Sequence, residues 1–397
     1  MPSKPQFVGK RVRLSELLID TFSGEWGRGE GETLTPVLRT SNFNEDGSLN
    51  YSTPAMRCIP ERKVVKKRMV RGDIILEKSG GTPKRPVGIM AFYDSDVLAL
   101  CSNFNQVLRF DEVRILPRFA FHQLRWLKDR NAFDRYTRKT TGLQNLQMKK
   151  LIEMKLHVPQ IEVQMSVATT LDEIVGNQRT LEREIAGFDS LVKSRFVEMF
   201  GDIDETPYEI RCIQDCSERI KDGTHQTPNY VEKSDGGVAF LSSKNVVGGT
   251  MDWDTIKYIP LDLHEKLQKR VAPRKGDVLL AKNGTTGVCA IVDRDCVFDI
   301  YVSLALIRPL EWMDSTYMWA AINAVKTKEQ FDKRLKGIGV PNLHLGEIKQ
   351  TLIVVPPLAL QQEFAAFASQ VNKSRFFFLG DERNEVLSIL DVVAYVC

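Results

Sequence analysis

Acid–lysine pairs are the first residues in this chain that could carry out chemistry. A glutamate followed two places later by lysine, with a further carboxylate close in space, can hold Mg²⁺ and polarise water for phosphodiester hydrolysis. Glu61 and Lys63 with Asp46 fit this pattern, as does the pair Glu153 and Lys155. Because 27% of the residues are charged, such triplets arise by chance. A stand-alone Mg²⁺-dependent nuclease, which Glu61→Ala would inactivate, is therefore only an alternative hypothesis.

Motifs for metals, cofactors and nucleotides are incomplete. Cys212 and Cys216 have the wrong spacing for a zinc knuckle, and the sequence His264–Glu265 lacks the second histidine of H-E-x-x-H. The sequence contains neither the N/D-P-P-Y/F tetrapeptide of an adenine methyltransferase nor the G-x-x-x-x-G-K-S/T phosphate loop of a motor. We therefore predict no catalytic residue, no metal site and no cofactor in this chain.

Polar and basic side chains beside glycines are better suited to binding DNA. Lysine and arginine contact phosphates, amides and hydroxyls read base edges, and glycine allows a close backbone approach. The candidates in the first half of the chain are Arg39, Ser41, Asn42, Lys78, Ser79, Lys84, Arg85, Arg138, Lys139 and Thr141. The candidates in the second half are His225, Ser243, Lys244, Asn245, Lys282, Asn283, Thr285, Arg334 and Lys336.

A simpler interpretation of the same glycine-rich segments involves no ligand. In it, the glycines form hairpins and the lysines are solvated, and two asparagines cap loops instead of reading bases. The residues concerned are Gly80, Gly81, Gly284, Gly287, Asn145 and Asn342.

An internal repeat indicates which elements position the candidates. RGDIILEKSGGT from Arg71 aligns without gaps on KGDVLLAKNGTT from Lys275. TGLQNLQMKKLIEMKLHVPQIEVQMSVA from Thr141 aligns on IGVPNLHLGEIKQTLIVVPPLALQQEFA from Ile338. A weaker match pairs PVLRTSN from Pro36 with AFLSSKN from Ala239. Three blocks in the same order indicate a duplicated domain.

Each repeat predicts the same order of elements. Short apolar runs, DIIL and DVLL, follow a Gly-Asp turn and predict buried strands. Helical stretches follow over 119–138 and 315–335. A glycine-containing loop and a short strand ending in Val-Pro come next, and each strand leads into a long helix.

The two long helices carry apolar seams. The first, over 163–200, has heptad spacing with one polar position, in Val167, Leu171, Ile174, Gln178, Leu181, Ile185, Phe188 and Val192. The second follows Pro357, with a matching seam in Leu360, Phe364, Phe367, Val371 and Phe378. Gly380 should end, kink or weaken this second helix. Two such seams in one chain predict that the helices pack on each other.

Composition excludes several protein classes. With 43% hydrophobic and 27% charged residues, the 397-residue chain is neither disordered nor fibrous. No apolar run reaches the 18 or more residues of a spanning helix, so we expect no membrane segment. Seven scattered cysteines and an N-terminus without an apolar core indicate a reduced, cytoplasmic protein.

Charge is distributed unevenly along the chain. Residues 1–160 hold 28 lysines and arginines against 17 acidic residues, whereas residues 161–206 hold 4 against 10. A basic unit next to an acidic helical segment suggests that the first faces a polyanion and the second faces solvent or a protein. Ordinary solvated surfaces are the alternative interpretation.

Together these features resemble the DNA-specificity (S) subunit of type I restriction-modification systems. The likeness covers nearly the whole chain. It rests on a twice-repeated set: a strand opened by Gly-Asp, a G-x-x-N-L loop, a VP-x-x-x-x-Q junction and a long helix. SRFVEMFGD from Ser194 resembles the end of the family's central helix, and DGTHQTPNY from Asp222 resembles the opening of a recognition domain.

The resemblance implies an α+β fold. Two duplicated target-recognition domains are separated by two long antiparallel coiled-coil helices, with a pseudo-two-fold axis. We expect the first recognition domain over 1–160, the central helix over 161–206, the second recognition domain over 207–357 and the C-terminal helix over 358–397.

The resemblance also implies a function. The chain would be the non-catalytic subunit that binds double-stranded DNA, each domain reading one half of a split target, while the helices set the spacing and dock methyltransferase (M) subunits. S-adenosylmethionine would bind in that partner, with the target adenine flipped out of the duplex. Cleavage would require a further restriction/translocase (R) subunit. A coiled-coil scaffold that binds proteins instead of DNA is the second hypothesis.

Overall fold

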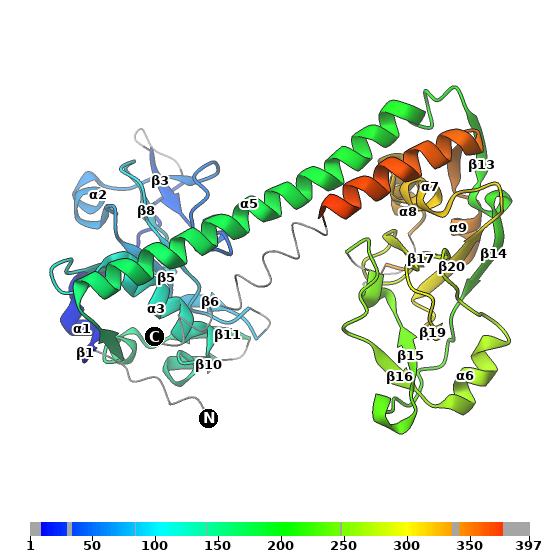
Figure 1. Ribbon diagram of the computed structural model, residues 1–397. Coiled ribbons are helices and arrows are strands. Elements are labelled where there is room, and N and C mark those ends of the chain that lie inside the picture. The colour runs from blue at the N-terminus through cyan, green and yellow to red at the C-terminus, as the bar shows by residue number, and fades with distance from the viewer. Residues whose placement is uncertain are drawn as a thin grey trace. The chain divides into compact units, whose positions relative to one another are not determined.

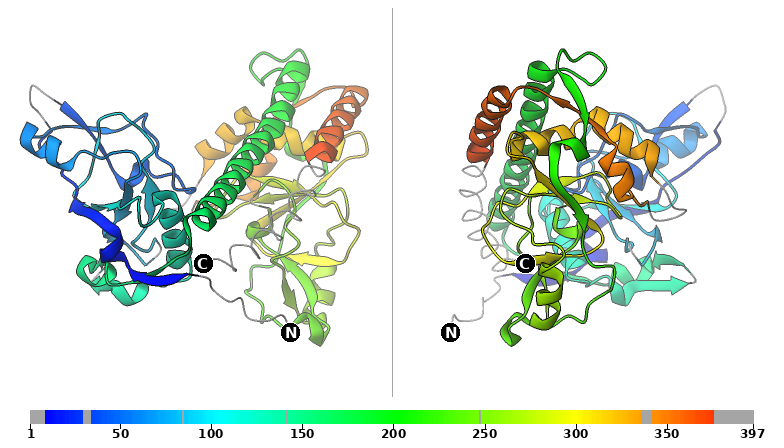
Figure 2. Two further views of the ribbon diagram at one scale, coloured as in Figure 1. Left: turned by 60° about the vertical axis from the view of Figure 1, so that its left-hand side comes forward. Right: turned by 90° about the vertical axis from the view of Figure 1, so that its right-hand side faces the viewer.

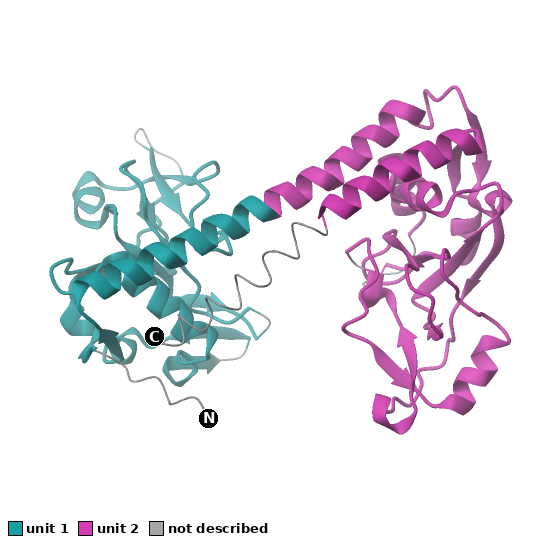
Figure 3. Cartoon of the chain, viewed as in Figure 1, with its two compact units in different colours: residues 1–181, 380–397 teal, residues 182–379 magenta. Residues whose placement is uncertain are grey.

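The computed structural model describes residues 9–29, 34–83, 85–140, 142–246, 248–335 and 341–375. The chain divides into two compact units at the boundary between Leu181 and Glu182 (Figure 3). One long helix, α5 (Ile161–Phe200), begins in unit 1 and ends in unit 2. Each unit is built around its own hydrophobic core. No helix in the described ranges is both long and apolar enough to cross a membrane.

Unit 1 contains sheets of four, three, three and two strands (Figure 1). The four-stranded sheet has the order β2-β9-β5-β7, the three-stranded sheets β4-β3-β8 and β10-β11-β6, and the small sheet β1-β12. The strands are β1 (Lys10–Arg13), β2 (Leu18–Ser23), β3 (Leu34–Leu38), β4 (Ala55–Cys58), β5 (Ile74–Glu77), β6 (Ser79–Gly81), β7 (Met90–Phe92), β8 (Leu100–Cys101), β9 (Asn105–Phe110), β10 (Thr137–Thr140), β11 (Leu143–Leu146) and β12 (Lys155–Val158). The helices are α1 (Leu14–Leu17), η1 (Thr40–Asn42), α2 (Glu61–Lys67), α3 (Pro117–Asp129), η2 (Asp134–Tyr136) and α4 (Met148–Leu151).

Unit 2 repeats this topology. Its sheets β14-β20-β17-β18, β16-β15-β19 and β13-β21 match β2-β9-β5-β7, β4-β3-β8 and β1-β12 strand for strand. The strands are β13 (Glu209–Cys212), β14 (Ser217–Asp222), β15 (Val238–Leu241), β16 (Lys257–Ile259), β17 (Val278–Ala281), β18 (Cys289–Ile291), β19 (Phe298–Ile300), β20 (Leu304–Pro309) and β21 (Leu352–Val355). The helices are η3 (Ile213–Cys216), η4 (Lys233–Asp235), η5 (Ser243–Val246), α6 (Leu261–Gln268), α7 (Ser315–Asn323), α8 (Val325–Arg334), α9 (Leu345–Lys349) and a final helix over 358–375. The duplication predicted from the repeated blocks is therefore confirmed.

The Gly-Asp motif marks a buried ion pair in each unit. Gly276, with φ +90°, turns the chain, and the carboxylate of Asp277 accepts hydrogen bonds from the backbone of Arg274 and from Arg308. Gly72, Asp73 and Arg109 repeat the arrangement in unit 1. A positive φ favours glycine, and a buried carboxylate requires a cationic partner. Both residues of the repeated Gly-Asp motif therefore have structural roles.

The glutamine of the VP-x-x-x-x-Q junction fastens each long helix to its unit. In unit 1 the Gln164 side chain donates to the carbonyl of Pro159 and accepts from the backbone N–H of Leu116, which caps α3. In unit 2 Gln361 makes the same two bonds, to Pro356 and to the Asp314 cap of α7. Both glutamines are 1% exposed.

Two predicted helices end earlier than their sequence patterns suggested. The stretch 119–138 is helical only to Asp129, because Asn131 adopts a left-handed backbone with φ +59°. Residues 137–140 then form strand β10. The stretch 315–335 divides into α7 and α8 because Ala324 is extended. The predictions of single helices over these two stretches were therefore wrong.

Only the two ends of the predicted seam on α5 lie in hydrophobic cores, whereas the middle positions Ile174, Leu181 and Ile185 are half-buried and Gln178 is exposed. Val167, Ala168 and Leu171 pack in unit 1, and Phe188, Val192, Phe196 and Phe200 pack in unit 2. In unit 2 the helix over 358–375 runs beside the second half of α5 (Figure 2). Ion pairs of Arg195 with Glu363 and of Arg375 with Asp189 show that the two helices are antiparallel. Phe378 and Gly380 lie outside the described residues.

The first half of α5 is also held by charged side chains. Asp172 of α5 accepts hydrogen bonds from Arg118 of α3 at 2.7 Å and contacts Nε2 of His122 at 2.7 Å. Further along, Arg179 pairs with Asp46. His122 is 8% exposed, so this pair lies at the edge of the core between α3 and α5.

This arrangement predicts that unit 1 loses stability in mild acid. Burial lowers the pKa of His122 below its ordinary value of 6.5, although the hydrogen bond with Asp172 opposes the shift. The folded state therefore binds fewer protons than the unfolded state just below that pH, and its stability falls as the pH drops through this range. His122→Gln keeps a hydrogen-bond donor but cannot titrate.

The measurement is hydrogen–deuterium exchange of α3 in the full chain. From about pH 7 to about pH 5, the free energy of opening of α3 should fall in the wild type and change less in His122→Gln. An identical fall in both proteins would contradict the role given to His122. Burial also raises the pKa of Asp172, but His122 and Arg118 hold it below its usual range, so the stability from this carboxylate is lost only in stronger acid.

Candidate nucleic-acid interface

A loop between β8 and β9 gathers the candidate segments of unit 1. We call residues 102–104 junction loop 1. The backbone N–H groups of Lys78 and Ser79 donate to the carbonyl of Phe104, at 2.9 and 3.2 Å. Next to this loop, Thr40 of η1 donates to the Asn105 side chain at 3.2 Å. The early block and the glycine loop, far apart in sequence, therefore meet here.

The β10–β11 hairpin extends this surface. Strand β11 pairs with β6, with Asn145 opposite Ser79, and the N–H of Leu146 donates to the carbonyl of Lys78. Arg138 and Lys139 lie exposed on β10, the outer strand of this sheet. The two basic residues predicted from the later block therefore lie in the same small sheet as the glycine loop.

Unit 2 has the same junction between β19 and β20. In junction loop 2 (residues 301–303), Ser303 accepts the N–H of Lys282 on its carbonyl and the N–H of Ser243 on its hydroxyl. Val302 donates to the carbonyl of Thr224, which precedes the exposed His225. Asn283 forms a single bridge with Asn342. The segments that carry Ser243, Lys282 and His225 therefore meet at this loop.

Two predicted candidates belong to the interior. Asn42 is 1% exposed and Asn245 is 3% exposed. Each accepts the backbone N–H three residues earlier and donates to two carbonyls of the following loop, those of Asn50 and Thr53 for Asn42. Because every polar atom of these amides is used inside the fold, we remove both residues from the candidate surface.

The two matching lysines differ. Lys282 is 5% exposed, and its Nζ lies 2.9 Å from Oδ2 of Asp222. Burial raises the pKa of Asp222, but the bond from Lys282 and nearby cations hold it below its usual range. Lys282 therefore supports the loop from within. Lys78 meets the neutral Ser23 and Gln106 instead, and burial lowers its pKa. Among the described residues, Lys78 forms no ion pair with a carboxylate.

Most of the other candidates stay at the surface. Arg334 is half-buried, and its guanidinium bonds the carbonyl of Glu347 and the hydroxyl of Thr351 within unit 2. Arg85 is exposed and pairs with the buried Glu77 at 3.3 Å. The remaining candidates are exposed or half-buried, namely Arg39, Ser41, Ser79, Ser243, Lys244, Asn283 and Thr285. Lys84, Thr141 and Lys336 lie outside the described residues.

The junction loops themselves were missed by the sequence reasoning. Asn103 is exposed and Phe104 is 53% exposed in junction loop 1. The available signal was alignment of SNFN from Ser102 with YVSL from Tyr301, which shares no identical residue. Their importance comes from strand pairing, which brings four separate segments to one place.

The nuclease pattern is not assembled. Asp46 is engaged by Arg179 and by the Ser48 backbone, and Lys63 of α2 pairs with Glu25 at 3.1 Å. His264 bonds Asp299 at 2.7 Å instead of forming a metal site. Among the described residues, no three histidine, cysteine or acidic side chains are grouped to hold a metal ion.

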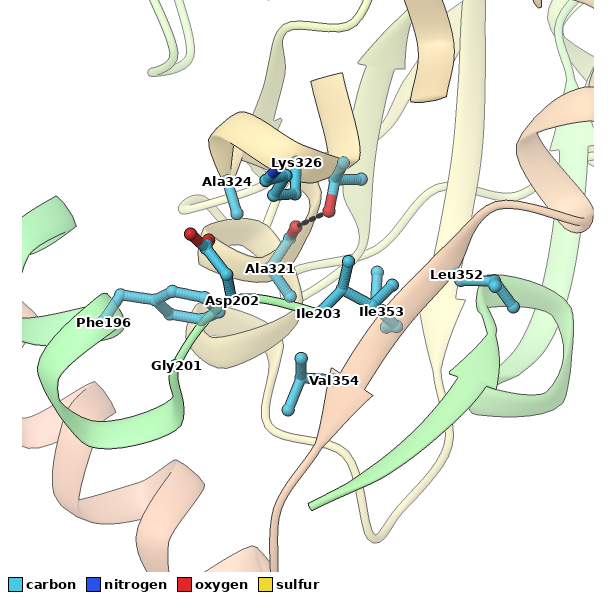
Figure 4. A pocket seen from close by; sticks show the side chains of 11 residues that line it. Phe196, Gly201, Asp202, Ile203, Ala321, Ala324, Lys326, Leu352, Ile353 and Val354 are labelled. Carbon is cyan, nitrogen blue, oxygen red and sulfur yellow. Dashed lines mark hydrogen bonds between the residues drawn. The ribbon is translucent and has the colours of Figure 1, made fainter. Parts of the chain in front are cut away.

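A small pocket in unit 2 is also unsuited to chemistry. It lies between the end of α5, α7 and β21, and aliphatic side chains such as Ile203, Ile353 and Val354 form much of its lining (Figure 4). Thr327 in its wall donates to the carbonyl of Ala321 at 2.7 Å. Lys326 at its edge pairs with Asp204 at 3.3 Å. These groups stabilise the fold.

Residues 207–387 match the protein family described as Type I restriction modification DNA specificity domain. The chain is 21% identical over 258 residues to the type I restriction enzyme MjaVIII specificity subunit of Methanocaldococcus jannaschii. That alignment covers 60% of this chain and 60% of the relative. The MjaX specificity subunit of the same organism is 22% identical, over 73% of this chain and 72% of that protein.

The fold likeness extends over the whole chain. The S subunit of a type I restriction-modification system from M. genitalium matches with a TM-score of 0.57 at 13% identity, covering 100% of this chain and 97% of that one. The predicted resemblance to type I specificity subunits and the predicted α+β fold are therefore confirmed.

Proposed function

We propose that this chain, as a relative of type I DNA-specificity subunits, is the non-catalytic subunit that binds double-stranded DNA by sequence. Each unit would read one half of a split target with the surface around its junction loop. The observation that carries the proposal is the duplicated junction: two copies of one architecture gather polar, basic and glycine residues at one surface of each unit.

Differences between the two surfaces support two different half-sites. The buried bonds of Asp73 and Asp277, and of Gln164 and Gln361, are the same in both units. The exposed segments are not. The loop after β5 in unit 1 runs from Glu77 to Gly88, whose N–H donates to the carbonyl of Glu77. The matching loop after β17 in unit 2 is shorter and runs from Ala281 to Gly287, whose N–H donates to the carbonyl of Ala281. A constant scaffold with variable loops suits a protein that reads variable sequences.

The long helices are the proposed docking site for methyltransferase subunits. Many side chains of α5 between residues 172 and 191 are exposed, and this segment is acidic. S-adenosylmethionine would bind in the methyltransferase, which would act on an adenine flipped from the duplex. A restriction/translocase subunit would be needed for cleavage. Since the proposed target is cellular DNA, we expect the complex in the cytoplasm.

Methylome sequencing tests the proposed function. Cells that express this chain with its methyltransferase partner should show modified adenines in a split motif, and cells with the methyltransferase alone should not. Exchanging residues 207–357 for those of another specificity subunit should change one half of the motif only. A change in both halves would contradict separate reading, and no modification from a soluble complex would favour the protein-binding scaffold.

The β10–β11 hairpin should contact DNA phosphates through Arg138 and Lys139. Replacing Arg138 and Lys139 together with alanine should weaken binding of target and unrelated duplexes alike. The slope of log affinity against log salt should become shallower by roughly two, one for each lost phosphate contact. Fluorescence anisotropy of the complex at several salt concentrations measures both effects.

A matched pair of lysines provides the control. Lys10 and Lys155 are exposed on the β1–β12 sheet. Strand β1 leads through α1 into the beginning of β2, whereas Ser23 near the junction loop is at the end of β2. Their double alanine variant should keep the slope. Equal changes in the two variants would mean that net charge, not the hairpin, determines the affinity.

A further inference from the structure

We propose that the Phe104 ring contacts the C5 methyl group of a thymine in the half-site read by unit 1. The inference rests on the proposed function and assigns one specificity determinant within it. It begins from an aromatic side chain that is 53% exposed next to Lys78, Ser79 and Gly80.

Junction loop 1 holds this ring in place. The carbonyl of Phe104 accepts the N–H groups of Lys78 and Ser79, and Asn105 donates its N–H to the carbonyl of Ser102 at 2.9 Å. Ser102 is 3% exposed and Asn105 is fully buried. The backbone on both sides is therefore fixed, and the exposure of Phe104 is a property of the folded loop.

A neighbouring glycine leaves room beside the ring. Gly80 has φ +99°, a conformation that side chains rarely adopt, and a Cβ built on it would lie 3.7 Å from the Phe104 ring. Asn103, the other exposed residue of the loop, offers a side-chain amide that has no hydrogen-bond partner among the described residues. On the edge of a base, an apolar ring can contact a methyl group while a neighbouring unpaired amide forms hydrogen bonds with the polar atoms.

The same backbone position has an internal role in unit 2. There Ser303 replaces Phe104, is 7% exposed, and accepts the N–H of Ser243 on its hydroxyl. In unit 1 the residue at this position points outward instead. The position is therefore structural in one copy and free to contact a ligand in the other.

The chemistry of the base edges indicates which group of the DNA the Phe104 ring contacts. Along the edges of the bases in the major groove, the apolar group is the thymine methyl, and aromatic or aliphatic side chains contact it. Insertion of the ring between two bases is the competing arrangement, which would bend the duplex. The two arrangements predict different responses to removal of a single methyl group.

The test is a scan of the target duplex in which each thymine in turn is replaced by deoxyuridine. The protein is the complete complex with its methyltransferase partner, and the target is the motif found by methylome sequencing. One of these deoxyuridine substitutions should weaken DNA binding by the wild-type complex about three- to tenfold, which is the effect expected from the loss of one buried methyl group. Phe104→Ser should bind the natural target more weakly by a similar factor and be insensitive at that position.

Two further variants separate contact from folding. Phe104→Leu keeps an apolar side chain and should keep part of the response to the methyl group. Val113→Ser removes a side chain that is 93% exposed and lies beyond the opposite end of β9, and this variant should behave like wild type. If Phe104→Ser folds poorly, a smaller response of Phe104→Leu than of wild type at that same thymine still assigns the methyl contact to this residue.

Each other outcome overturns the inference in a distinguishable way. If no deoxyuridine weakens wild-type binding, or the same one weakens Phe104→Ser equally, the methyl contact is refuted while DNA recognition stands. A weaker Phe104→Ser with unchanged sensitivity at every thymine would indicate insertion between bases. If the wild-type complex shows no preference for the target over unrelated DNA, the proposed function fails and the inference fails with it.

Discussion

Replacing Arg308 with alanine is expected to destabilise unit 2 by about 3–5 kcal/mol, the cost of leaving a buried charge without its partner. Arg308 donates two hydrogen bonds to Asp277, at 2.7 and 2.8 Å, and a third to the carbonyl of Ala272. The Asp277 side chain is 1% exposed. Without the guanidinium, this carboxylate must remain buried and unpaired or take up a proton.

Hydrogen–deuterium exchange of the full chain localises this effect. Protection should fall across β17 and β20 while β5 and β9 of unit 1 keep theirs. Arg219→Ala is the control, since Arg219 lies opposite Arg308 on β14 but is exposed, and it should change stability by less than about 0.5 kcal/mol. Arg109→Ala should cost less than Arg308→Ala, because Arg109 is 23% exposed and water can partly replace it. Equal losses from Arg308→Ala and Arg219→Ala would refute the argument.

Replacing Phe364 with alanine is expected to cost about 3–5 kcal/mol and to release the helix over 358–375 from α5. Phe364 is fully buried, and its ring centroid lies 5.6 Å from that of Phe196, 5.7 Å from Phe200 and 6.4 Å from Tyr317. The substitution would leave a cavity among three aromatic rings. Such a cavity collapses poorly, because the rings are held by α5 and α7.

The adjacent residue supplies the control for this prediction. Glu363 pairs with Arg195 at 3.4 Å, but both side chains are substantially exposed, so Glu363→Ala should cost at most about 1 kcal/mol. Urea unfolding gives the free energies, and exchange of peptides from 358–375 reports release of the helix. Retained protection of these peptides in Phe364→Ala would show that the ion pairs, not the aromatic cluster, hold the helix.

The repeated architecture could be predicted because its determinants are local. Gly72 and Gly276 need a positive φ, and Gln164 and Gln361 bond a proline carbonyl five residues away. Such residues recur in the sequence wherever the backbone recurs. The apolar seam of α5 was readable for the same reason, since a helix fixes which side chains share a face.

The interface was harder to predict because it depends on contacts between distant segments. Lys78 and Lys282 are aligned and identical, but Lys282 is buried because β14 places Asp222 beside it, where unit 1 has Ser23. The pairing of β6 with β11 likewise brings Arg138 near Ser79. Sequence spacing does not reveal which strands become neighbours. The candidate residue types were therefore predictable, whereas their exposure was not.

Apolar and charged contacts hold both halves of α5, but the ion pairs of Asp172 and Arg179 dominate the first half and the aromatic cluster dominates the second, so ionic strength and temperature should affect them differently. The charged contacts of Asp172 and Arg179 in unit 1 are partly exposed, so salt screens them. The aromatic cluster around Phe196 in unit 2 is insensitive to screening but weakens on cooling, as burial of apolar surface does. Added salt should therefore loosen the beginning of this helix, whereas cold should loosen its end.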